Sequence, residues 1–182
     1  MFKTDNILLL SATDMEHQSK DLFGIPIFIT GIGKVNAAIK ATKLIQKYDP
    51  DIVINFGSCG NLKNYQIGEV LEVGKVYNDI DTLGFHKSKS IKLANNSKIK
   101  CFTTDHMYDS SHEDYLESYL EKIDKCDIVD MELFSIAKSC KSAGKFLYSY
   151  KWVSDDGSND DWLKNAKVGF DNFKIIFKKR FL

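Results

Sequence analysis

The sequence has no excess of either charge. Lys and Arg together number 25, and Asp and Glu together also number 25. Proteins that bind nucleic acids carry a basic surplus that neutralises phosphates, so we expect no nucleic-acid partner. No apolar run approaches the length that crosses a bilayer, and the charged residues Lys3 and Asp5 stand just before the first apolar run. This pattern predicts neither a signal peptide nor a membrane anchor, and therefore no membrane partner.

The sequence also lacks the spacings that are typical of disulfide frameworks and metal sites. Its four cysteines form no C-x-x-C pair and lie in or beside apolar stretches, which is typical of reduced thiols in a cytoplasmic protein. These are Cys59, Cys101, Cys126 and Cys140. The four histidines do not fall at ligand spacings with the cysteines, so we expect no metal site, and no motif implies a cofactor. These are His17, His86, His106 and His112.

Short, continuously apolar runs alternate with helical patterns along the chain. The runs lie at 7–10, 25–30, 52–56, 128–129 and 146–153, and they are typical of strands buried on both faces of a sheet. Helical periodicity covers about 35–48, 131–142 and 162–177, whereas 68–104 predicts strands or irregular loops. At 182 residues, one domain over 1–182 is the default. We therefore predict an α/β fold, with a mixed, mostly parallel twisted sheet flanked by helices.

Carboxylates follow three of the predicted strands at the edge where α/β sheets bind ligands. Glu16, Glu132 and Asp155 come after the runs at 7–10, 128–129 and 146–153, and a predicted glycine turn with Ser58 follows the run at 52–56. Taken singly, Glu132 and Asp155 fit helix capping, Glu16 fits a surface acid, and the glycines fit any tight turn. Together they indicate a site, because clustered carboxylates repel one another unless a ligand, water or proton lies between them.

Four motifs occur in the order seen in the nucleoside phosphorylase superfamily, and the chain resembles that superfamily over about 7–165. The motifs are Ile-Gly-Lys-Val-Asn-Ala-Ala at 32–38, Pro-Asp-Ile-Val-Ile-Asn-Phe-Gly-Ser-Cys-Gly at 50–60, Val-Asp-Met-Glu at 129–132 and Val-Ser-Asp at 153–155. The branch it most resembles is that of the 5′-methylthioadenosine/S-adenosylhomocysteine nucleosidases. The resemblance implies a nucleoside phosphorylase-like fold, a purine nucleoside as the small-molecule substrate and a homodimer.

The resemblance also implies roles for individual residues. Asp155 matches the general acid that protonates N7 of the departing purine, Glu132 matches the carboxylate that holds the ribose hydroxyls, and Glu16 matches the acid that orients the attacking water. An aspartate has an ordinary pKa of about 3.9, so this role requires burial or a neighbouring carboxylate to keep the proton on Asp155. Substrate contacts are implied for Ser58, Gly60, Met107, Tyr108, Met131 and Ser154. Trp162 and Phe170 are candidate lids, and 77–85 resembles the segment that reaches across the dimer interface.

Water is the expected nucleophile, because the chain lacks the arginines with which phosphorylases of the superfamily hold phosphate. Acids occupy the first loop, and Asn55 stands where the second arginine is expected. Lys151 replaces an arginine that nucleosidases carry near the water site, and the chain is shorter than typical members. Other purine nucleosides, such as futalosine, adenosine or inosine, therefore stay open as substrates. A phosphate-dependent phosphorylase and a non-catalytic nucleoside-binding relative are the alternative functions.

Overall fold

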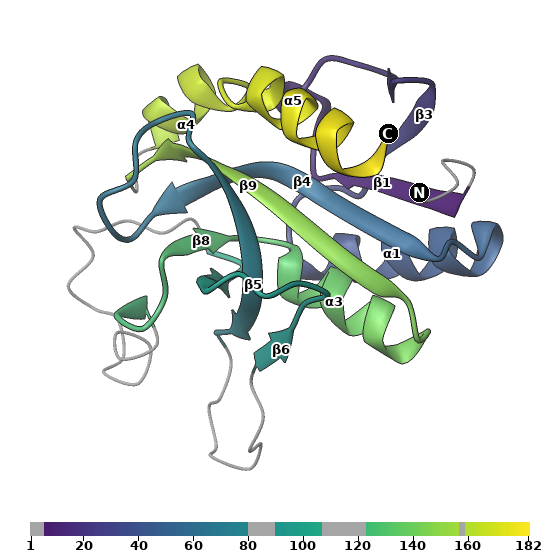
Figure 1. The fold of residues 1–182 in the computed structure, drawn as a ribbon. Coiled ribbons are helices and arrows are strands. Elements are labelled where there is room, and N and C mark those ends of the chain that lie inside the picture. The colour runs from purple at the N-terminus through teal and green to yellow at the C-terminus, as the bar shows by residue number, and fades with distance from the viewer. Residues whose placement is uncertain (1–5, 80–89, 107–122, 157–158) are drawn as a thin grey trace, which may run out of the picture.

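A computed structural model describes residues 6–79, 90–106, 123–156 and 159–182, and within them nine strands form one mixed sheet with helices on both faces (Figure 1). The strands are β1 (Ile7–Ser11), β2 (Asp21–Leu22), β3 (Ile25–Ile29), β4 (Ile52–Asn61), β5 (Val70–Asn78), β6 (Ser90–Lys92), β7 (Ile99–Thr103), β8 (Ile128–Asp130) and β9 (Phe146–Asp155). The helices are the 3₁₀ turn η2 (Asp14–Glu16), α1 (Lys34–Tyr48), α3 (Leu133–Ser142), α4 (Asn159–Asn165) and α5 (Phe170–Phe181). The predicted fold class is confirmed.

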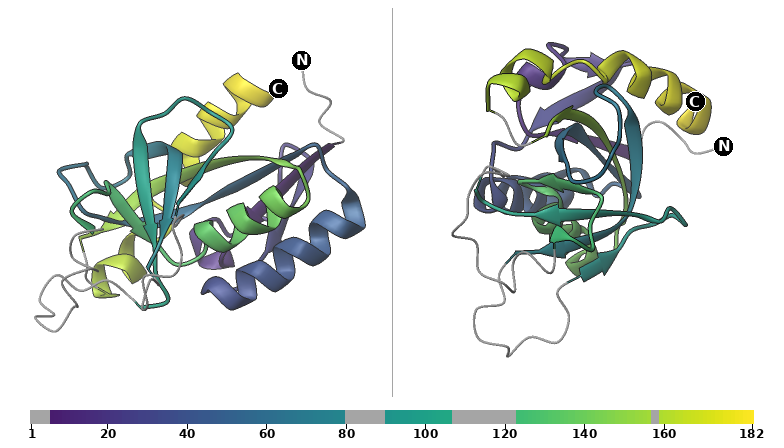
Figure 2. Two further views of the ribbon diagram at one scale, coloured as in Figure 1. Left: turned by 90° about the horizontal axis from the view of Figure 1, so that it is seen from below. Right: turned by 90° about the vertical axis from the view of Figure 1, so that its left-hand side faces the viewer.

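The long strands β4 and β9 form the centre of the sheet. They run parallel from Ile52↔Phe146 to Gly60↔Asp155, and β1 and β3 extend the sheet from β4 with further parallel pairings. At its carboxyl end β4 also pairs with β8, β8 pairs with β7, β7 with β5, and β5 with β9. These pairings close a ring of five strands (Figure 2), in which Gly60 of β4 pairs with both Val129 of β8 and Asp155 of β9.

The predicted glycine turn after Phe56 is wrong, because β4 continues through it to Asn61. Residues 57–60 keep their pairing with β9, and one irregularity falls between Cys59 and Gly60. The glycines instead allow neighbouring side chains to approach the backbone of β4 closely. A Cβ on Gly57 would lie 2.5 Å from Oε1 of Glu16, and one on Gly60 would lie 2.8 Å from a methyl carbon of Val129. The strand therefore carries its glycines and Ser58 directly into the site.

Helices α1 and α3 cover one face of the sheet and α5 covers the other (Figure 1). Aliphatic side chains of α1 and α3, such as Ala41 and Ile136, pack on the first face, while Phe173 and Phe177 of α5 pack on Phe56 and neighbouring aromatic rings of the second. None of the described helices is both long enough and apolar enough to span a membrane.

The helix predicted at 162–177 is two helices, α4 and α5, separated by residues 166–169. The break comes where the chain passes close to the sheet: Ala166 accepts a hydrogen bond from the Trp152 indole at 2.7 Å, and a Cβ on Gly169 would collide with the Trp152 side chain. Tertiary packing thus overrides the continuous helical periodicity of the sequence.

Candidate active site

A cavity of about 250 Å³ lies at the carboxyl ends of β1, β4, β8 and β9. Six of the residues singled out in the sequence line it together: Glu16, Ser58, Gly60, Met131, Glu132 and Asp155. They come from segments far apart in the chain. The parallel pairing of β1 and β9 with β4 brings Glu16, Ser58, Gly60 and Asp155 to one edge, and the antiparallel pairing of β8 with the end of β4 adds Met131 and Glu132. A concave cavity with several convergent carboxyl groups is the arrangement expected of a ligand site.

Glu16 is a buried acceptor rather than a surface acid, since its relative exposure is 3%. Its Oε2 accepts hydrogen bonds from Ser11 Oγ at 2.7 Å and from the backbone N–H groups of Ala12 at 3.2 Å and Thr13 at 3.4 Å. Its Oε1 accepts from the backbone N–H of Ser58 at 2.7 Å and from Ser58 Oγ at 2.8 Å. Five donors therefore fix both oxygens at the wall of the cavity.

Glu132 precedes α3 but does not cap it, because its side chain makes no capping hydrogen bond. The Asp130 carboxylate takes that place by accepting from the backbone N–H of Leu133 at 2.8 Å. Oε1 of Glu132 instead accepts from the backbone N–H of Gly33 at 2.9 Å. Burial raises the pKa of the Glu132 carboxyl group, while the Lys151 ammonium and the Gly33 N–H oppose that shift.

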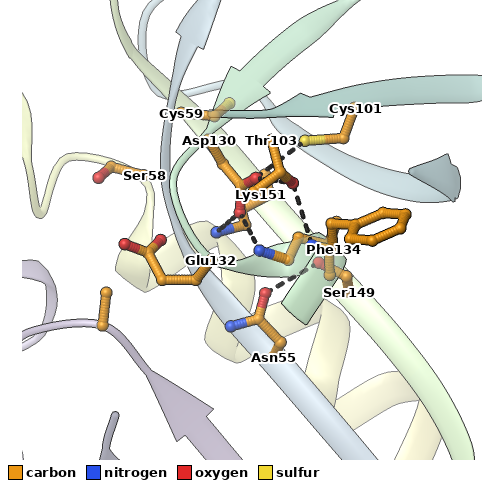
Figure 3. A network of polar contacts seen from close by, with 12 residues as sticks. Asn55, Ser58, Cys59, Cys101, Thr103, Asp130, Glu132, Phe134, Ser149 and Lys151 are labelled. Carbon is orange, nitrogen blue, oxygen red and sulfur yellow. Dashed lines mark hydrogen bonds and ion pairs between the residues drawn. The ribbon is translucent and has the colours of Figure 1, made fainter. Parts of the chain in front are cut away.

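Beneath the cavity, Lys151 forms an ion pair with Asp130. Nζ lies 2.9 Å from Oδ2 of Asp130, and both side chains are 1% exposed. Oδ1 of Asp130 also accepts from Thr103 Oγ1 at 2.6 Å and from Cys101 Sγ at 3.4 Å (Figure 3). Burial lowers the pKa of Lys151, but the charges of Asp130, Glu132 and Glu16 outweigh it, and the net shift is upward. A fixed positive charge thus lies beneath the cavity, among carboxyl groups.

Asp155 lies at the end of β9, opposite Gly60. Ser154 does not line the cavity; its Oγ donates to Oδ2 of Asp155 at 2.7 Å and lies 3.1 Å from the carbonyl oxygen of Cys59. Glycine at 60 leaves room for the acid, because a Cβ there would lie 3.3 Å from Oδ1 of Asp155. The buried acid therefore faces the same cavity as Glu16 and Glu132.

Comparisons with known proteins find relatives both in sequence and in fold. Residues 23–92 match the model of the phosphorylase superfamily. Among solved structures, a 5′-methylthioadenosine/S-adenosylhomocysteine nucleosidase from Neisseria meningitidis in complex with methylthio-immucillin-A superposes with a TM-score of 0.78 at 19% identity, covering 93% of this chain and 96% of that one. The chain has the nucleoside phosphorylase fold. A futalosine hydrolase of Helicobacter pylori shares it, with a TM-score of 0.77 at 18% identity over 95% of this chain and 97% of that one.

Curated relatives match the chain over a shorter stretch. A 5′-methylthioadenosine/S-adenosylhomocysteine nucleosidase of Staphylococcus aureus is 52% identical over 58 residues, which are 31% of this chain and 25% of that protein. The corresponding protein of an Exiguobacterium species is 46% identical over 63 residues, or 34% and 27%. The aligned stretch therefore spans about a quarter of these relatives. In sequence, the chain resembles the nucleosidase branch of the superfamily.

Of the other residues that the resemblance implies at the site, some line the cavity and others do not. Met107 and Tyr108 lie outside the described residues, as does most of 77–85. Trp162 lines the cavity, as expected for a lid, and His106 lines it as well. Phe170 does not: it packs against Phe56 and other rings of the core, so the expectation that it is a lid is wrong.

Asp130 was missed as a site residue, although it lines the cavity and anchors Lys151. The Val-Asp-Met-Glu motif contains it, but a carboxylate at a strand end does not reveal which buried cation it will face. Asn55, at the expected arginine position, points away from the cavity: its Nδ2 donates to the Leu10 carbonyl at 3.3 Å, and its Oδ1 accepts from Ser149 Oγ at 3.2 Å.

The lining of the cavity lacks a cation within the part of the chain that the structure describes. No lysine or arginine is among its lining residues, whereas Glu16, Asp130, Glu132 and Asp155 are. Cys59 also lines it, but burial raises the pKa of its thiol, and the thiol donates to the Trp152 carbonyl at 3.3 Å. A thiol in this state is a poor nucleophile. The chemistry of the cavity therefore depends on its carboxyl groups.

Proposed function

We propose that the chain is a purine nucleosidase, an N-glycosyl hydrolase that splits 5′-methylthioadenosine, S-adenosylhomocysteine or a related purine nucleoside into base and sugar. The observation that carries the proposal is the convergence of Asp155, Glu132 and Glu16 on one cavity of the nucleoside phosphorylase fold. The names of the matched relatives supply the substrate class. The cavity provides an acid that protonates the leaving base, an anion that binds the sugar and a carboxylate that orients the water.

Asp155 acts as the general acid in this proposal. A purine leaves poorly as an anion, so protonation at N7 must accompany cleavage of the bond between N9 and the anomeric carbon. Asp155 is buried and faces the cavity, and the Ser154 hydroxyl donates to its Oδ2 at 2.7 Å. That hydrogen bond orients the carboxyl group at the wall of the cavity.

Glu132 binds the ribose hydroxyls and stabilises the sugar cation that develops as the base departs. An anion near that cation gains more interaction energy in the transition state than with the neutral substrate, which is what accelerates a reaction. Burial raises the pKa of Glu132, so the free protein disfavours the anion. Two hydroxyl donors from the ribose favour the ionised form when substrate binds. Lys151 beneath the cavity acts in the same direction.

Glu16 and Ser58 hold the attacking water. The oxygen of water bonds to the anomeric carbon as the bond to N9 breaks, and the bonding pair stays on the base. One proton passes from Asp155 to N7, and one proton of the water passes to Glu16. The products are the neutral base and the free sugar, and exchange with solvent returns both carboxyl groups to their starting states. The five donors to Glu16 keep its two oxygens in place for this step.

Hydrolysis is favoured over phosphorolysis by the charge of the site. Phosphate would have to enter a cavity whose described lining holds four acidic residues and neither lysine nor arginine. Lys151 is committed to Asp130 and fully buried. A phosphate dianion therefore meets repulsion with no bidentate partner.

We also propose the wider setting of the protein: one domain acting as a homodimer in the cytoplasm. The dimer rests on the resemblance of 77–85 to the segment that crosses to a neighbouring site. The cytoplasm rests on the four cysteines, all of which are buried free thiols.

A screen of purine nucleosides tests the proposed function. Purified protein is incubated with 5′-methylthioadenosine, S-adenosylhomocysteine, futalosine, adenosine and inosine, each with and without phosphate, and base release is measured by liquid chromatography. We expect release without phosphate and an unphosphorylated sugar as product. Strict dependence on phosphate would make the protein a phosphorylase. Binding of adenine without base release from any of these nucleosides would make it a nucleoside-binding protein.

A further inference from the structure

Trp162 of α4 uses its indole N–H inside the cavity. Nε1 donates to Ser58 Oγ at 2.9 Å, and the side chain is half-buried at the cavity wall. The indole N–H of Trp152, in contrast, donates a hydrogen bond to the backbone oxygen of Ala166 in the core. A wall for an apolar ligand needs only the ring of a tryptophan, so the directed N–H of Trp162 points to an additional role.

The hydrogen bonds of Ser58 leave it with only one way to contact a ligand. A serine hydroxyl has one hydrogen to donate and two lone pairs to accept with. The hydrogen is directed to Oε1 of Glu16 at 2.8 Å, and Trp162 occupies one lone pair. An ionised Glu16 has only acceptors, and an indole N–H can only donate, so the direction of both bonds is fixed. Ser58 therefore presents a single lone pair to the cavity.

We propose that Trp162 is a positioning residue that fixes Ser58 as a hydrogen-bond acceptor for the attacking water. This inference rests on the proposed function and adds how the nucleophile is oriented. A water that donates one O–H to Ser58 and the other to Glu16 has its own lone pairs left for the anomeric carbon. Without the indole N–H, Ser58 still donates to Glu16 but offers two open lone pairs, so the water has more than one place to donate and its oxygen is less well aligned with the anomeric carbon.

Trp162→Phe tests this role, because it keeps an aromatic wall and removes the N–H. We expect kcat for base release to fall roughly 10- to 100-fold, as for a misplaced reacting group, with KM little changed. Leu163→Ala is the matched control in the same helix: Leu163 is 57% exposed and does not line the cavity, so its kcat should equal that of the wild type. Adenine affinity, measured by calorimetry, should be equal in all three proteins.

A double-mutant cycle with Ser58→Ala separates positioning from a wall role. If Trp162 acts through the Ser58 hydroxyl, Trp162→Phe should cost little further kcat once Ser58 is alanine. A second readout is the product formed in aqueous methanol. Methanol has one O–H and cannot satisfy both Ser58 and Glu16, so the wild type should favour the free sugar. The methyl glycoside fraction should rise in Trp162→Phe.

The outcomes distinguish the inference from the proposed function. An active wild type together with Trp162→Phe at unchanged kcat and product ratio overturns the role of Trp162 and leaves the nucleosidase standing. Equal losses from Trp162→Phe in the wild-type and Ser58→Ala backgrounds also overturn it, because the ring would then act independently of Ser58. A wild type that releases no base from any nucleoside overturns both.

Discussion

Replacing Lys151 with methionine is expected to lower the free energy of unfolding by about 3 kcal/mol, because it leaves the Asp130 carboxylate without its cation. Both side chains are 1% exposed, and removing one partner of a buried pair costs about 3–5 kcal/mol. Asp130 keeps three other donors, namely Thr103 Oγ1, Cys101 Sγ and the backbone N–H of Leu133, which places the cost at the lower end.

Urea denaturation followed by circular dichroism measures this loss. The matched control is Lys145→Met, whose partner Asp49 is 86% exposed; a surface pair of this kind contributes about 0–1 kcal/mol. Adding Asp130→Asn to Lys151→Met should recover part of the loss, since no buried charge then lacks a partner. A loss in Lys151→Met no larger than in Lys145→Met would refute the assignment of Lys151 as the counter-charge beneath the cavity.

Three further predictions concern the chemistry of the site. Asp155→Asn should lower kcat roughly 10²- to 10⁴-fold with the free energy of unfolding nearly unchanged; near-normal base release in this variant would contradict its role as the acid. Gly57→Ala places a Cβ 2.5 Å from Oε1 of Glu16, so kcat should fall and the free energy of unfolding should drop by about 1–3 kcal/mol. Wild-type values of both quantities would show that the Glu16 carboxylate can move away at no cost. The pH profile of kcat/KM should show an acid limb with an apparent pKa above the ordinary glutamate pKa of about 4.3. Burial raises the pKa of Glu132, and activity is lost as falling pH protonates this carboxylate. An acid limb with a pKa at or below about 4.3, or one that persists in Glu132→Gln, would argue against this assignment.

The sequence predicted the parts of the fold that depend on local patterns. Apolar runs located the central strands, and the helical periodicity over about 35–48 located α1 and its end. The convergence of Glu16 and Asp155 was predictable as well, because parallel strands bring their carboxyl ends to one edge; Glu132 reaches the same cavity from β8, which runs antiparallel to β4. The resemblance to the nucleoside phosphorylase superfamily is confirmed over 23–92, which include the motifs at 32–38 and 50–60, and the fold is confirmed over 93% of the chain.

Other features depended on packing between distant segments and could not be predicted. The continuation of β4 beyond Phe56 depends on its pairing with β9, and no property of residues 57–60 predicts that pairing. The break between α4 and α5 follows from contact with Trp152, a residue of the sheet. The ion pair of Lys151 with Asp130 joins β9 and β8, two strands that do not pair with each other in the sheet, and each residue alone is typical of a surface charge.

The placement of Ser58 and Asp155 on β4 and β9 also determines how the site can open. Local unfolding begins in segments with few buried contacts, whereas central strands exchange their amide hydrogens only when the whole domain unfolds. Ser58 and Asp155 belong to the two longest strands, which pair from Ile52↔Phe146 to Gly60↔Asp155, so separating the two residues requires breaking the pairing of β4 with β9. On heating or in denaturant, the relative positions of Ser58 and Asp155 should therefore persist until the whole domain unfolds. Loss of base release and loss of the native state should then occur together.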